Sequence, residues 1–548
     1  MSGEDLLELK DVAFRYRDRE EEAIRQISFS VEEGEIFLIA GASGCGKTTL
    51  IRTINGLIPR SYKGELSGEV LLYGENPQEW TLSKISQRVA TVLQDPERQI
   101  LGTKVLNEVA FGLENLGLPR EEIYSRVDRS LEQLNIIHLR DRETFNLSGG
   151  EKQKVALAGV LAMEPDILLL DEPLASLDPV SAQETLLAVR DLADRGITVL
   201  MVEHRVEDVL GIHPDRVMFM HDGEIRYLGE PEGLIKVVDY REVKLPAEMV
   251  IQQAKNHPPP SKLDILPGVS PEGKELESLV RFQEVSFGYE REMEVLHNIN
   301  LTIDRGDVIA VLGPNGAGKT TFVKHAIGLL EPASGDVYIE GRNTKKATVA
   351  EIASTVGYVF QSPSHMLFAQ TVFQELSFGP KNLGHSSEEI EKEVKEALEI
   401  VNLEAKEDDP PLSLSFGQQK RVSIAAILAM RSRILVMDEP NAGQDYENYM
   451  NFMDSILQMP GFESILFVTH DVDLALIYAN RVILVADGFI RADGSPEEVL
   501  SDLDLLESCN LVPTSLLKAN LERASRLDRF MRAEALAHIS DRPSHGLT

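Results

Sequence analysis

The sequence predicts an α/β fold that is built twice, and two observations carry this prediction. The chain repeats itself: GASGCGKTT at 41–49 returns as GPNGAGKTT at 313–321, and ILLLDEP at 167–173 returns as ILVMDEP at 434–440. Within each copy, short apolar runs of strand length alternate with helical stretches, which is typical of a largely parallel sheet covered by helices. Two related domains of similar length are therefore expected in tandem.

The domain boundaries follow from the repeat and from the composition between the copies. Residues 255–279 contain three consecutive prolines and lack helical or strand periodicity, as linkers do. We expect a first domain at 1–245, a linker at 246–279, a second domain at 280–505 and a helical tail at 506–548. In the tail, apolar residues at helical spacing predict one amphipathic helix packed on its own domain, formed by Leu517, Leu521, Ala524, Leu527 and Met531.

Composition excludes several classes of protein. The chain has 548 residues, of which 43% are hydrophobic and 26% charged, as in folded globular domains. Its net charge of −34 would repel a phosphate backbone, so we do not expect a nucleic acid partner. Cys45 and Cys509 are the only cysteines, which excludes a disulfide framework and a cysteine-ligated metal site and fits a reducing compartment. No run of 18 apolar residues occurs, so the chain is not expected to span a membrane by itself.

The repeated Gly-rich segments predict two phosphate-binding loops. Both match GxxxxGK[ST], follow a strand-like apolar run and precede a plausible helix start, as this motif requires. Glycines let backbone N–H groups close around phosphates at a helix N-terminus, the lysines would reach the β- and γ-phosphates, and Thr48 and Thr320 would ligate Mg²⁺. The predicted nucleotide-binding residues are Gly41, Ser43, Gly44, Gly46, Lys47, Thr48 and Thr49 in the first copy, and Gly313, Asn315, Gly316, Gly318, Lys319, Thr320 and Thr321 in the second.

Paired acidic residues end a buried strand in each copy. Asp171 and Asp438 each follow four apolar residues, so a buried strand would deliver their carboxylates to the phosphate site, where they would hold Mg²⁺ or its water. Glu172 and Glu439 come next and are positioned to polarise an attacking water, as a general base must. These four carboxylates complete two predicted nucleotide-hydrolysing sites.

Together with LSGGEKQ at 147–153, these motifs resemble those of the ATP-binding-cassette (ABC) ATPases, over both copies and so nearly the whole chain. The resemblance implies two P-loop cassettes, each with a mainly parallel core sheet, an antiparallel β part and a helical subdomain. It implies ATP and Mg²⁺ as cofactors. It also implies roles for further residues: adenine stacking by Tyr16 and Tyr289, Mg²⁺ and partner sensing by Gln94 and Gln361, γ-phosphate contact by His204 and His470, D-loop positions for Asp178 and Asp445, and signature positions for Ser148, Gly149, Gly150, Ser415 and Gly417.

In this family two cassettes dimerise head to tail, so each nucleotide lies between the phosphate loop of one and the signature of the other. Site one would join Lys47, Asp171, Glu172 and His204 with the second signature. Site two would join Lys319, Asp438, Glu439 and His470 with the first signature. The second signature departs from the pattern, because Phe416 stands where the first copy has Gly149, and the second D-loop differs as well. We therefore predict two sites of unequal activity, with site two the stronger.

Three stretches are similar to the ATPases of energy-coupling-factor (ECF) importers, which take up vitamins, their precursors or transition metals. They are 55–70 and the segments that follow Gln94 and Gln361. The resemblance implies a transmembrane coupling subunit docking near 105–126, a membrane substrate-binding subunit, and a peripheral place on the cytoplasmic face of the membrane. Two alternatives remain open: the ATPase of an ordinary solute importer, and a tandem ABC ATPase acting on ribosomes or DNA. The transported substrate is not encoded in this chain.

Overall fold

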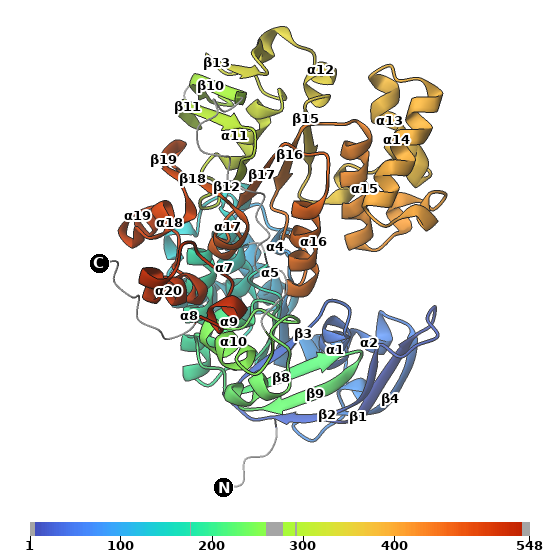
Figure 1. Ribbon diagram of the computed structural model, residues 1–548. Helices are drawn as coiled ribbons and strands as arrows, with labels where there is room; N and C mark the ends of the chain where they lie inside the picture. The colour runs from blue at the N-terminus through green and yellow to red at the C-terminus, as the bar shows by residue number, and fades with distance from the viewer. Residues whose placement is uncertain (1–5, 176, 259–277, 291–292, 540–548) are drawn as a thin grey trace, which may run out of the picture. The chain divides into compact units, whose positions relative to one another are not determined.

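The fold was obtained as a computed structural model that describes residues 6–175, 177–258, 278–290 and 293–539. Contacts divide the chain into two compact units. The first comprises Met1–Leu245 with Asp445–Glu447, and the second comprises Pro246–Gln444 with Asn448–Thr548. Each unit contains strands and helices in the same order, so the predicted repeated α/β fold is confirmed (Figure 1).

The first unit is built on a six-stranded sheet in the order β5-β6-β7-β3-β8-β9. Its first five strands are parallel, and only the β8–β9 hairpin is antiparallel. The central strands are apolar along most of their length because both faces of this sheet are covered. The strands are β3 (Ile36–Gly41), β5 (Val89–Val92), β6 (Ile167–Asp171), β7 (Thr198–Val202), β8 (Arg216–His221) and β9 (Glu224–Gly229).

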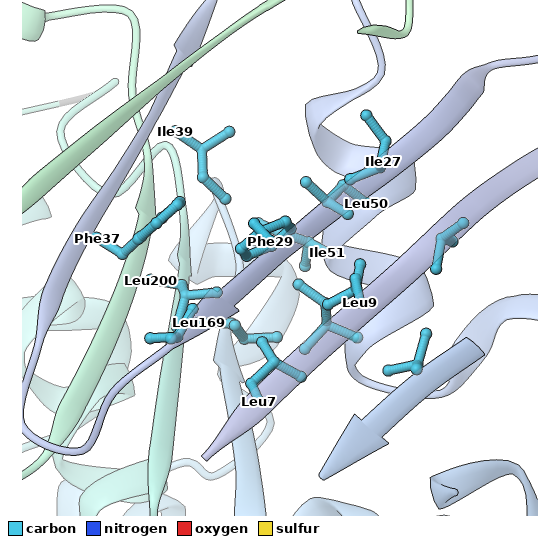
Figure 2. Close-up of a cluster of buried hydrophobic side chains, with 14 of the residues drawn as sticks. Leu7, Leu9, Ile27, Phe29, Phe37, Ile39, Leu50, Ile51, Leu169 and Leu200 are labelled. Carbon is cyan, nitrogen blue, oxygen red and sulfur yellow. The ribbon is translucent and has the colours of Figure 1, made fainter. Parts of the chain in front are cut away.

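A second, antiparallel sheet packs on this one. It has the order β2-β1-β4 and consists of β1 (Leu7–Tyr16), β2 (Ile24–Val31) and β4 (Gly64–Leu72). Figure 2 shows the core between the two sheets, where Leu7, Leu9 and Phe29 point toward Phe37, Leu169 and Leu200. All six of these side chains are buried, so the antiparallel part is fixed to the main sheet by a continuous apolar layer.

Helices complete the first unit. The segment 105–126, expected as one helical region, contains α5 and the start of α6, which are separated because Gly117 adopts φ 72° and Pro119 follows it. Helices α5, α6 and α7 pack together as a helical subdomain. The helices are α1 (Lys47–Ile54), α2 (Leu57–Arg60), α3 (Leu82–Arg88), α4 (Pro96–Gln99), α5 (Val105–Asn115), α6 (Arg120–Gln133), α7 (Gly149–Leu161), α8 (Pro179–Asp194) and α9 (Val206–Leu210).

The second unit repeats this architecture. Its main sheet has the order β15-β16-β17-β12-β18-β19 and its antiparallel sheet the order β11-β10-β13-β14. The strands are β10 (Ser278–Phe287), β11 (Leu296–Asp304), β12 (Val308–Leu312), β13 (Ser334–Ile339), β14 (Arg342–Asn343), β15 (Val356–Val359), β16 (Ile434–Asp438), β17 (Ser464–Thr469), β18 (Arg481–Ala486) and β19 (Phe489–Gly494). Helices α13, α14 and α15 form its helical subdomain (Figure 1). The helices shared with the first unit are α11 (Lys319–Ala326), α12 (Val349–Ala353), α13 (Val372–Asn382), α14 (Ser387–Ile400), α15 (Phe416–Ala429), α16 (Tyr446–Gln458) and α17 (Val472–Tyr478).

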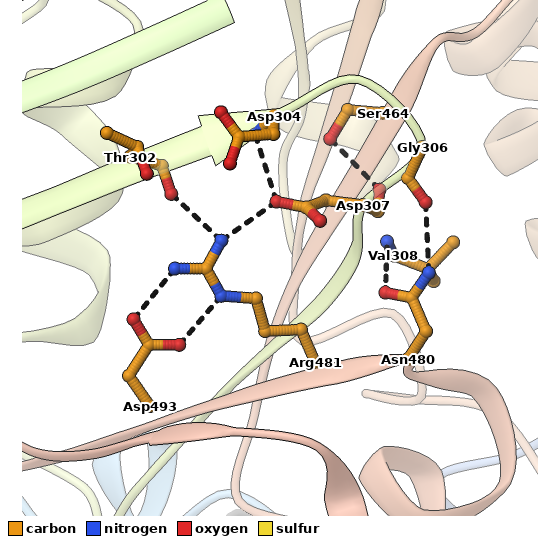
Figure 3. Close-up of polar contacts among 9 residues, drawn as sticks. All are labelled: Thr302, Asp304, Gly306, Asp307, Val308, Ser464, Asn480, Arg481 and Asp493. Carbon is orange, nitrogen blue, oxygen red and sulfur yellow. Dashed lines mark hydrogen bonds and ion pairs between the residues drawn. The ribbon is translucent and has the colours of Figure 1, made fainter. Parts of the chain in front are cut away.

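Polar side chains fasten the strand starts on the side opposite the phosphate loop. In the second unit, Arg481 donates to Asp307 Oδ2 at 2.9 Å and to both oxygens of Asp493 at 2.7 Å (Figure 3). Asn480 Oδ1 accepts from Val308 N at 2.8 Å, which aligns β12 with β18. The two charged partners, Asp493 and then Asp307, raise the pKa of Arg481, since their carboxylates stabilise its charge.

The tail corrects one prediction. Helix α20 (Ser515–Glu522) ends before Ala524, so Leu527 and Met531 do not continue the expected amphipathic helix. The reason is Asn520, fully buried, whose side chain donates to Met531 O at 2.9 Å and accepts from Met531 N at 2.7 Å, which turns the chain back. The tail does pack on its own unit, as expected, through contacts of α20 with α17. The remaining helices here are α18 (Pro496–Leu500), α19 (Leu503–Ser508) and α21 (Ala533–Leu536).

The range expected as a linker contains a short helix. Helix α10 (Ala247–Ala254) contacts α20 and α21, and these contacts place it in the second unit. Most of the remaining linker, 259–277, lies outside the described residues. In the described ranges, no helix combines the length and apolar character needed to cross a bilayer.

Candidate nucleotide sites

The two Gly-rich segments form loops that lead from a buried strand directly into a helix. In the first unit, β3 ends at Gly41 and α1 begins at Lys47. Gly44 and Gly46 have φ values of 81° and 106°, which side chains rarely adopt, so glycine is required for the loop to close. The second loop has the same course between β12 and α11. Each loop therefore presents backbone N–H groups at a helix N-terminus, where the helix dipole favours an anion.

The loop lysines are held by the carbonyls of their own loops. Lys47 is 4% exposed and donates to Gly41 O and Ala42 O, both at 2.8 Å. Lys319 is placed in the same way by Gly313 O at 2.8 Å and by the next carbonyl at 2.9 Å. Each ammonium thus lies at the edge of its loop, where it would meet phosphate oxygens.

Asp171 and Asp438 end their strands beside the loops, as predicted. In the second unit, Thr320 Oγ1 lies 3.1 Å from Asp438 Oδ2, and Tyr358 donates its phenol hydrogen to the same oxygen at 2.9 Å. Burial raises the pKa of Asp438 and raises that of Asp171 to about 6, with Glu172 adding to the shift of Asp171. A hydroxyl and a carboxylate this close are the hard oxygen ligands that Mg²⁺ prefers, so these residues fit that ion.

The glutamates that follow are held differently in the two units. In the first unit, Glu172 Oε1 lies 2.8 Å from His204 Nε2, and Gln94 Nε2 donates to Glu172 Oε2 at 2.7 Å. Burial pushes the pKa of Glu172 upward, but the bond to His204 and the nearby positive charges outweigh burial and lower it. Both carboxylate oxygens of Glu172 are therefore engaged.

In the second unit, Glu439 Oε1 lies 3.1 Å from His470 Nδ1. Glu439 Oε2 is buried and, within the described residues, has no hydrogen-bond partner. Gln361, the residue corresponding to Gln94, is exposed and makes no described contact with the glutamate. Within the described residues, one oxygen of Glu439 thus accepts no hydrogen bond, unlike either oxygen of Glu172.

The signature serines lie at helix N-termini. Ser148 caps α7, and Ser415 caps α15, each in a reciprocal capping box with the residue three positions on. Both serines are exposed, and both helices exceed twelve residues, so their N-termini are positively polarised. Phe416, which follows Ser415, is 37% exposed and lies against the D-loop glycine Gly443, where an added Cβ would be 3.5 Å from its ring.

The predicted adenine-stacking tyrosines differ in exposure. The Tyr16 hydroxyl lies 3.1 Å from Thr49 Oγ1, and the ring is partly buried beside Phe14. Tyr289 is 60% exposed, and its hydroxyl lies 3.3 Å from Thr321 Oγ1. Each tyrosine therefore lies next to the helix that starts at its phosphate loop.

Comparison with known proteins identifies this arrangement. The family model described as "ABC transporter" matches residues 24–175 and 296–442, which is more than half of the chain. The chain belongs to the ABC transporter family. Each unit is an ABC cassette with the P-loop α/β fold, and the ABC chain is an ATPase with two nucleotide-binding cassettes.

Relatives cover nearly all of this ABC ATPase. A protein of Methanosarcina mazei is 36% identical over 93% of this chain and 92% of its own length. A protein of Streptococcus pneumoniae is 38% identical over 94% of this chain and 95% of its own length. Both are named "Putative ABC transporter ATP-binding protein". The solved structure of cbiO1 from Clostridium perfringens, part of the ABC transporter complex cbiONQ, is 33% identical and covers 43% of this chain and 95% of its own, with a TM-score of 0.39.

Three residues near these sites were missed by the sequence analysis. Tyr358 contacts Asp438, Glu203 is a buried carboxylate next to His204 in the chain, and Lys420 is a buried lysine that donates to Pro440 O, one residue after Glu439. The only signal in the sequence is that each differs from its counterpart in the other copy, which is Thr91, Thr469 and Gln153 respectively.

Proposed function

We propose that this chain is the ATP-hydrolysing energy-coupling subunit of an ECF-type importer, peripheral on the cytoplasmic face of the membrane. It would work with a transmembrane coupling subunit and a membrane substrate-binding subunit, and drive uptake of a vitamin, a vitamin precursor or a transition metal ion. The observation that carries this proposal beyond ATP hydrolysis is an apolar face that recurs on both helical subdomains.

The roles proposed for the site residues follow from their geometry. Lys47 and Lys319 bind phosphate oxygens, Glu172 and Glu439 polarise the attacking water, and their partner histidines orient them toward the γ-phosphate. Mg²⁺, held by the loop threonines and the strand-end aspartates, would neutralise charge on the phosphates. A carboxylate oxygen that accepts no other hydrogen bond is the stronger acceptor for the proton of a water molecule, and within the described residues Glu439 has such an oxygen.

The two cassettes are proposed to pair head to tail, which gives sites one and two as defined above. Site two combines the free oxygen of Glu439 with the Gly149–Gly150 signature. Site one combines the doubly engaged Glu172 with the Phe416 signature. Both differences favour site two as the faster one.

The apolar face of the first cassette consists of Leu101, Phe111 and Phe145. Leu101 N and Gly102 N both donate to Glu108 Oε2, at 2.7 and 2.6 Å, one helical turn before Phe111 on α5. Thr144, next to Phe145, donates its hydroxyl hydrogen to Gly102 O at 2.7 Å. The buried Glu108 carboxylate thereby gathers three exposed apolar side chains around one loop.

The second cassette presents the same face at the same positions of the repeat, with Phe368, Phe378 and Leu412. Phe368 N donates to Glu375 Oε2 at 2.8 Å, and the rings of Phe368 and Phe378 lie edge to face at 4.9 Å. The six side chains of the two faces are between 47% and 70% exposed. Exposed apolar clusters of this kind mark interaction sites.

A partner that presents two similar apolar helical elements would fit such a duplicated face. The membrane coupling subunit of an importer is such a partner, because it must receive movement from both cassettes. A ribosome or DNA would instead require basic surface on a chain whose net charge is −34.

Recovery of partners with the full-length chain tests this proposal. We expect detergent-solubilised membranes to yield integral membrane subunits with the wild-type chain and with Leu187→Asp, a control at an exposed apolar residue of α8. The double variant Phe111→Asp and Phe378→Asp should keep its ATPase activity and lose these subunits. Equal recovery with all three chains, or sedimentation with ribosomes without membrane subunits, would contradict the proposal.

A further inference from the structure

In the first cassette, the buried carboxylate of Glu203 joins the segment that follows Glu172 to the loop that contains His204. Leu174 N donates to Glu203 Oε1 at 2.8 Å. Glu203 Oε2 accepts from His204 N at 2.9 Å and from Arg205 N at 3.2 Å. Glu203 is 1% exposed, so both of its oxygens bind backbone groups of two separate loops.

The Glu203 carboxylate joins the two chain segments beyond the end of the sheet, where their backbones no longer bond each other. The last backbone bond between the two chain segments runs from Glu172 N to Val202 O at 2.9 Å, just beyond the paired ends of β6 and β7. Past this point the backbones diverge, and the Glu203 side chain bridges the gap. Hydrogen bonds from backbone N–H groups to a carboxylate are about twice as strong as neutral ones, which makes this a firm link.

The second cassette lacks this link. Thr469 occupies the position of Glu203, and its hydroxyl accepts from Asp471 N at 3.0 Å within its own loop. Asn441, which corresponds to Leu174, has a buried Oδ1 without a hydrogen-bond partner among the residues that the structure describes. A threonine is too short to reach that segment, so the segment after Glu439 is not fastened to the loop of His470 in this way.

A buried lysine fastens that segment from the other side. Lys420 is 1% exposed, and its ammonium donates to Pro440 O, one residue after Glu439. The ammonium lies 5.3 Å from the ring centre of Phe416 and 5.4 Å from that of Phe452. Lys420 belongs to α15, the helix that begins at the signature serine, whereas Gln153 occupies its position in the first cassette.

We propose that Glu203 and Lys420 are positioning residues. Each holds the segment that follows the catalytic glutamate of its own cassette, but the two segments are held to different elements. Glu203 ties the first segment to the loop of His204, and Lys420 ties the second segment to the helix of Ser415. The proposal rests on the head-to-tail pairing proposed above, which places His204 and Ser415 together in site one. Because both side chains are buried and bond backbone groups of their own cassettes, we expect both to act on the rate of hydrolysis and not on ATP binding.

The rate of single-turnover ATP hydrolysis by a full-length chain that carries Glu439→Gln measures the activity of site one, because the substitution inactivates site two. In this background, Glu203→Thr and Lys420→Gln each introduce the residue of the other cassette. We expect each to lower the maximal rate by about fivefold, while the ATP concentration for half-maximal rate changes by less than about twofold. A larger change in that concentration than in the rate would contradict a positioning role.

Double-mutant cycles separate positioning from a general structural effect. Glu203→Thr should cause no further loss once His204→Ala is present, whereas its effect should multiply with that of Ser415→Ala. Lys420→Gln should show the reverse pattern. Glu35→Gln is the control, since Glu35 is a buried carboxylate at the other end of the sheet, paired with Arg216; it should lower the melting temperature and leave the rate unchanged.

Two outcomes would overturn the proposal: effects of Glu203→Thr and His204→Ala that multiply, or a Glu203→Thr chain that behaves like Glu35→Gln. If Glu203→Thr fails to fold, Glu203→Gln replaces it, because the amide keeps one acceptor and should give an intermediate rate. If Ser415→Ala alone leaves the site-one rate unchanged, the proposed pairing is wrong, while the cycle of Glu203 with His204 still decides the role of Glu203.

Discussion

The two cassettes share one fold but differ in how many hydrogen bonds hold the carboxylate of their glutamates. Glu172 is bonded on both oxygens, to His204 and Gln94, whereas Glu439 keeps one buried oxygen without a partner in the described residues. The strands, loops and helices around them are in the same order. Duplicated folds therefore fix where the reactive groups lie, while a few side chains around them set how ready each group is to react.

The aspartates differ in the same way. Asp438 accepts the phenol hydrogen of Tyr358 at 2.9 Å, while Thr91, at the corresponding place, bonds Asn55 at 3.2 Å instead of Asp171. Residues that bond a metal ligand orient it and hold it ready for the ion. The second cassette thus has the better-oriented aspartate, while its glutamate is held by fewer bonds than that of the first cassette.

The largest expected effect concerns the glutamates themselves. Glu439→Gln should lower the steady-state rate of ATP hydrolysis by about 10² to 10³-fold, as removal of a general base does, because it inactivates the faster site. Glu172→Gln should cost less than about tenfold. Phosphate release measured on both variants checks this, and equal losses would remove the proposed asymmetry.

Tyr358, which bonds Asp438, should affect the Mg²⁺ concentration that hydrolysis requires. Without the phenol bond, Asp438 is less well oriented, so Tyr358→Phe should raise the Mg²⁺ concentration for half-maximal hydrolysis by about tenfold. Titration of activity with Mg²⁺ measures this. Thr91→Val is the matched control in the first cassette and should leave the value unchanged; an equal shift in both variants would contradict a special role for Tyr358.

The second signature offers a gain of function. Phe416→Gly restores the flexible residue found at Gly149, and should raise the single-turnover rate of site one, measured with Glu439→Gln present, by about threefold. The reverse change, Gly149→Phe, should slow site two when Glu172→Gln is present. A Phe416→Gly chain with an unchanged or slower site one would show that the phenylalanine is not what limits it.

The last prediction concerns stability and leaves the comparison of rates unchanged. Burial lowers the pKa of Lys420 to about 7, so between that pH and its ordinary value of 10.5 the unfolded chain binds more protons and stability rises with pH. Lys420→Met removes the buried charge, and Pro440 O keeps its bond from Gln444 at 2.9 Å. Thermal unfolding should show the variant stabilised by about 1 to 3 kcal/mol at pH 6, with the gain shrinking toward pH 9. A gain that grows with pH would contradict this.

The sequence predicted the parts of the sites that depend on backbone geometry. The phosphate loops, the strand-end aspartates and the glutamates follow from motifs whose residues are close along the chain, so spacing alone places them. Glu203, Lys420 and Tyr358 escaped prediction because each contacts a segment at least 20 residues away, which only the folded sheet brings near. The amphipathic tail helix was wrong for the same reason, since Asn520 reverses the chain through a contact that periodicity does not reveal.

The central claim, that the chain contains one fast and one slow ATPase site, is tested most directly by rapid-quench hydrolysis of ATP bound to the unmodified chain. The account predicts two phases of equal amplitude, about one phosphate per chain in each, with the fast phase lost in Glu439→Gln. A single phase that releases about two phosphates per chain would contradict it.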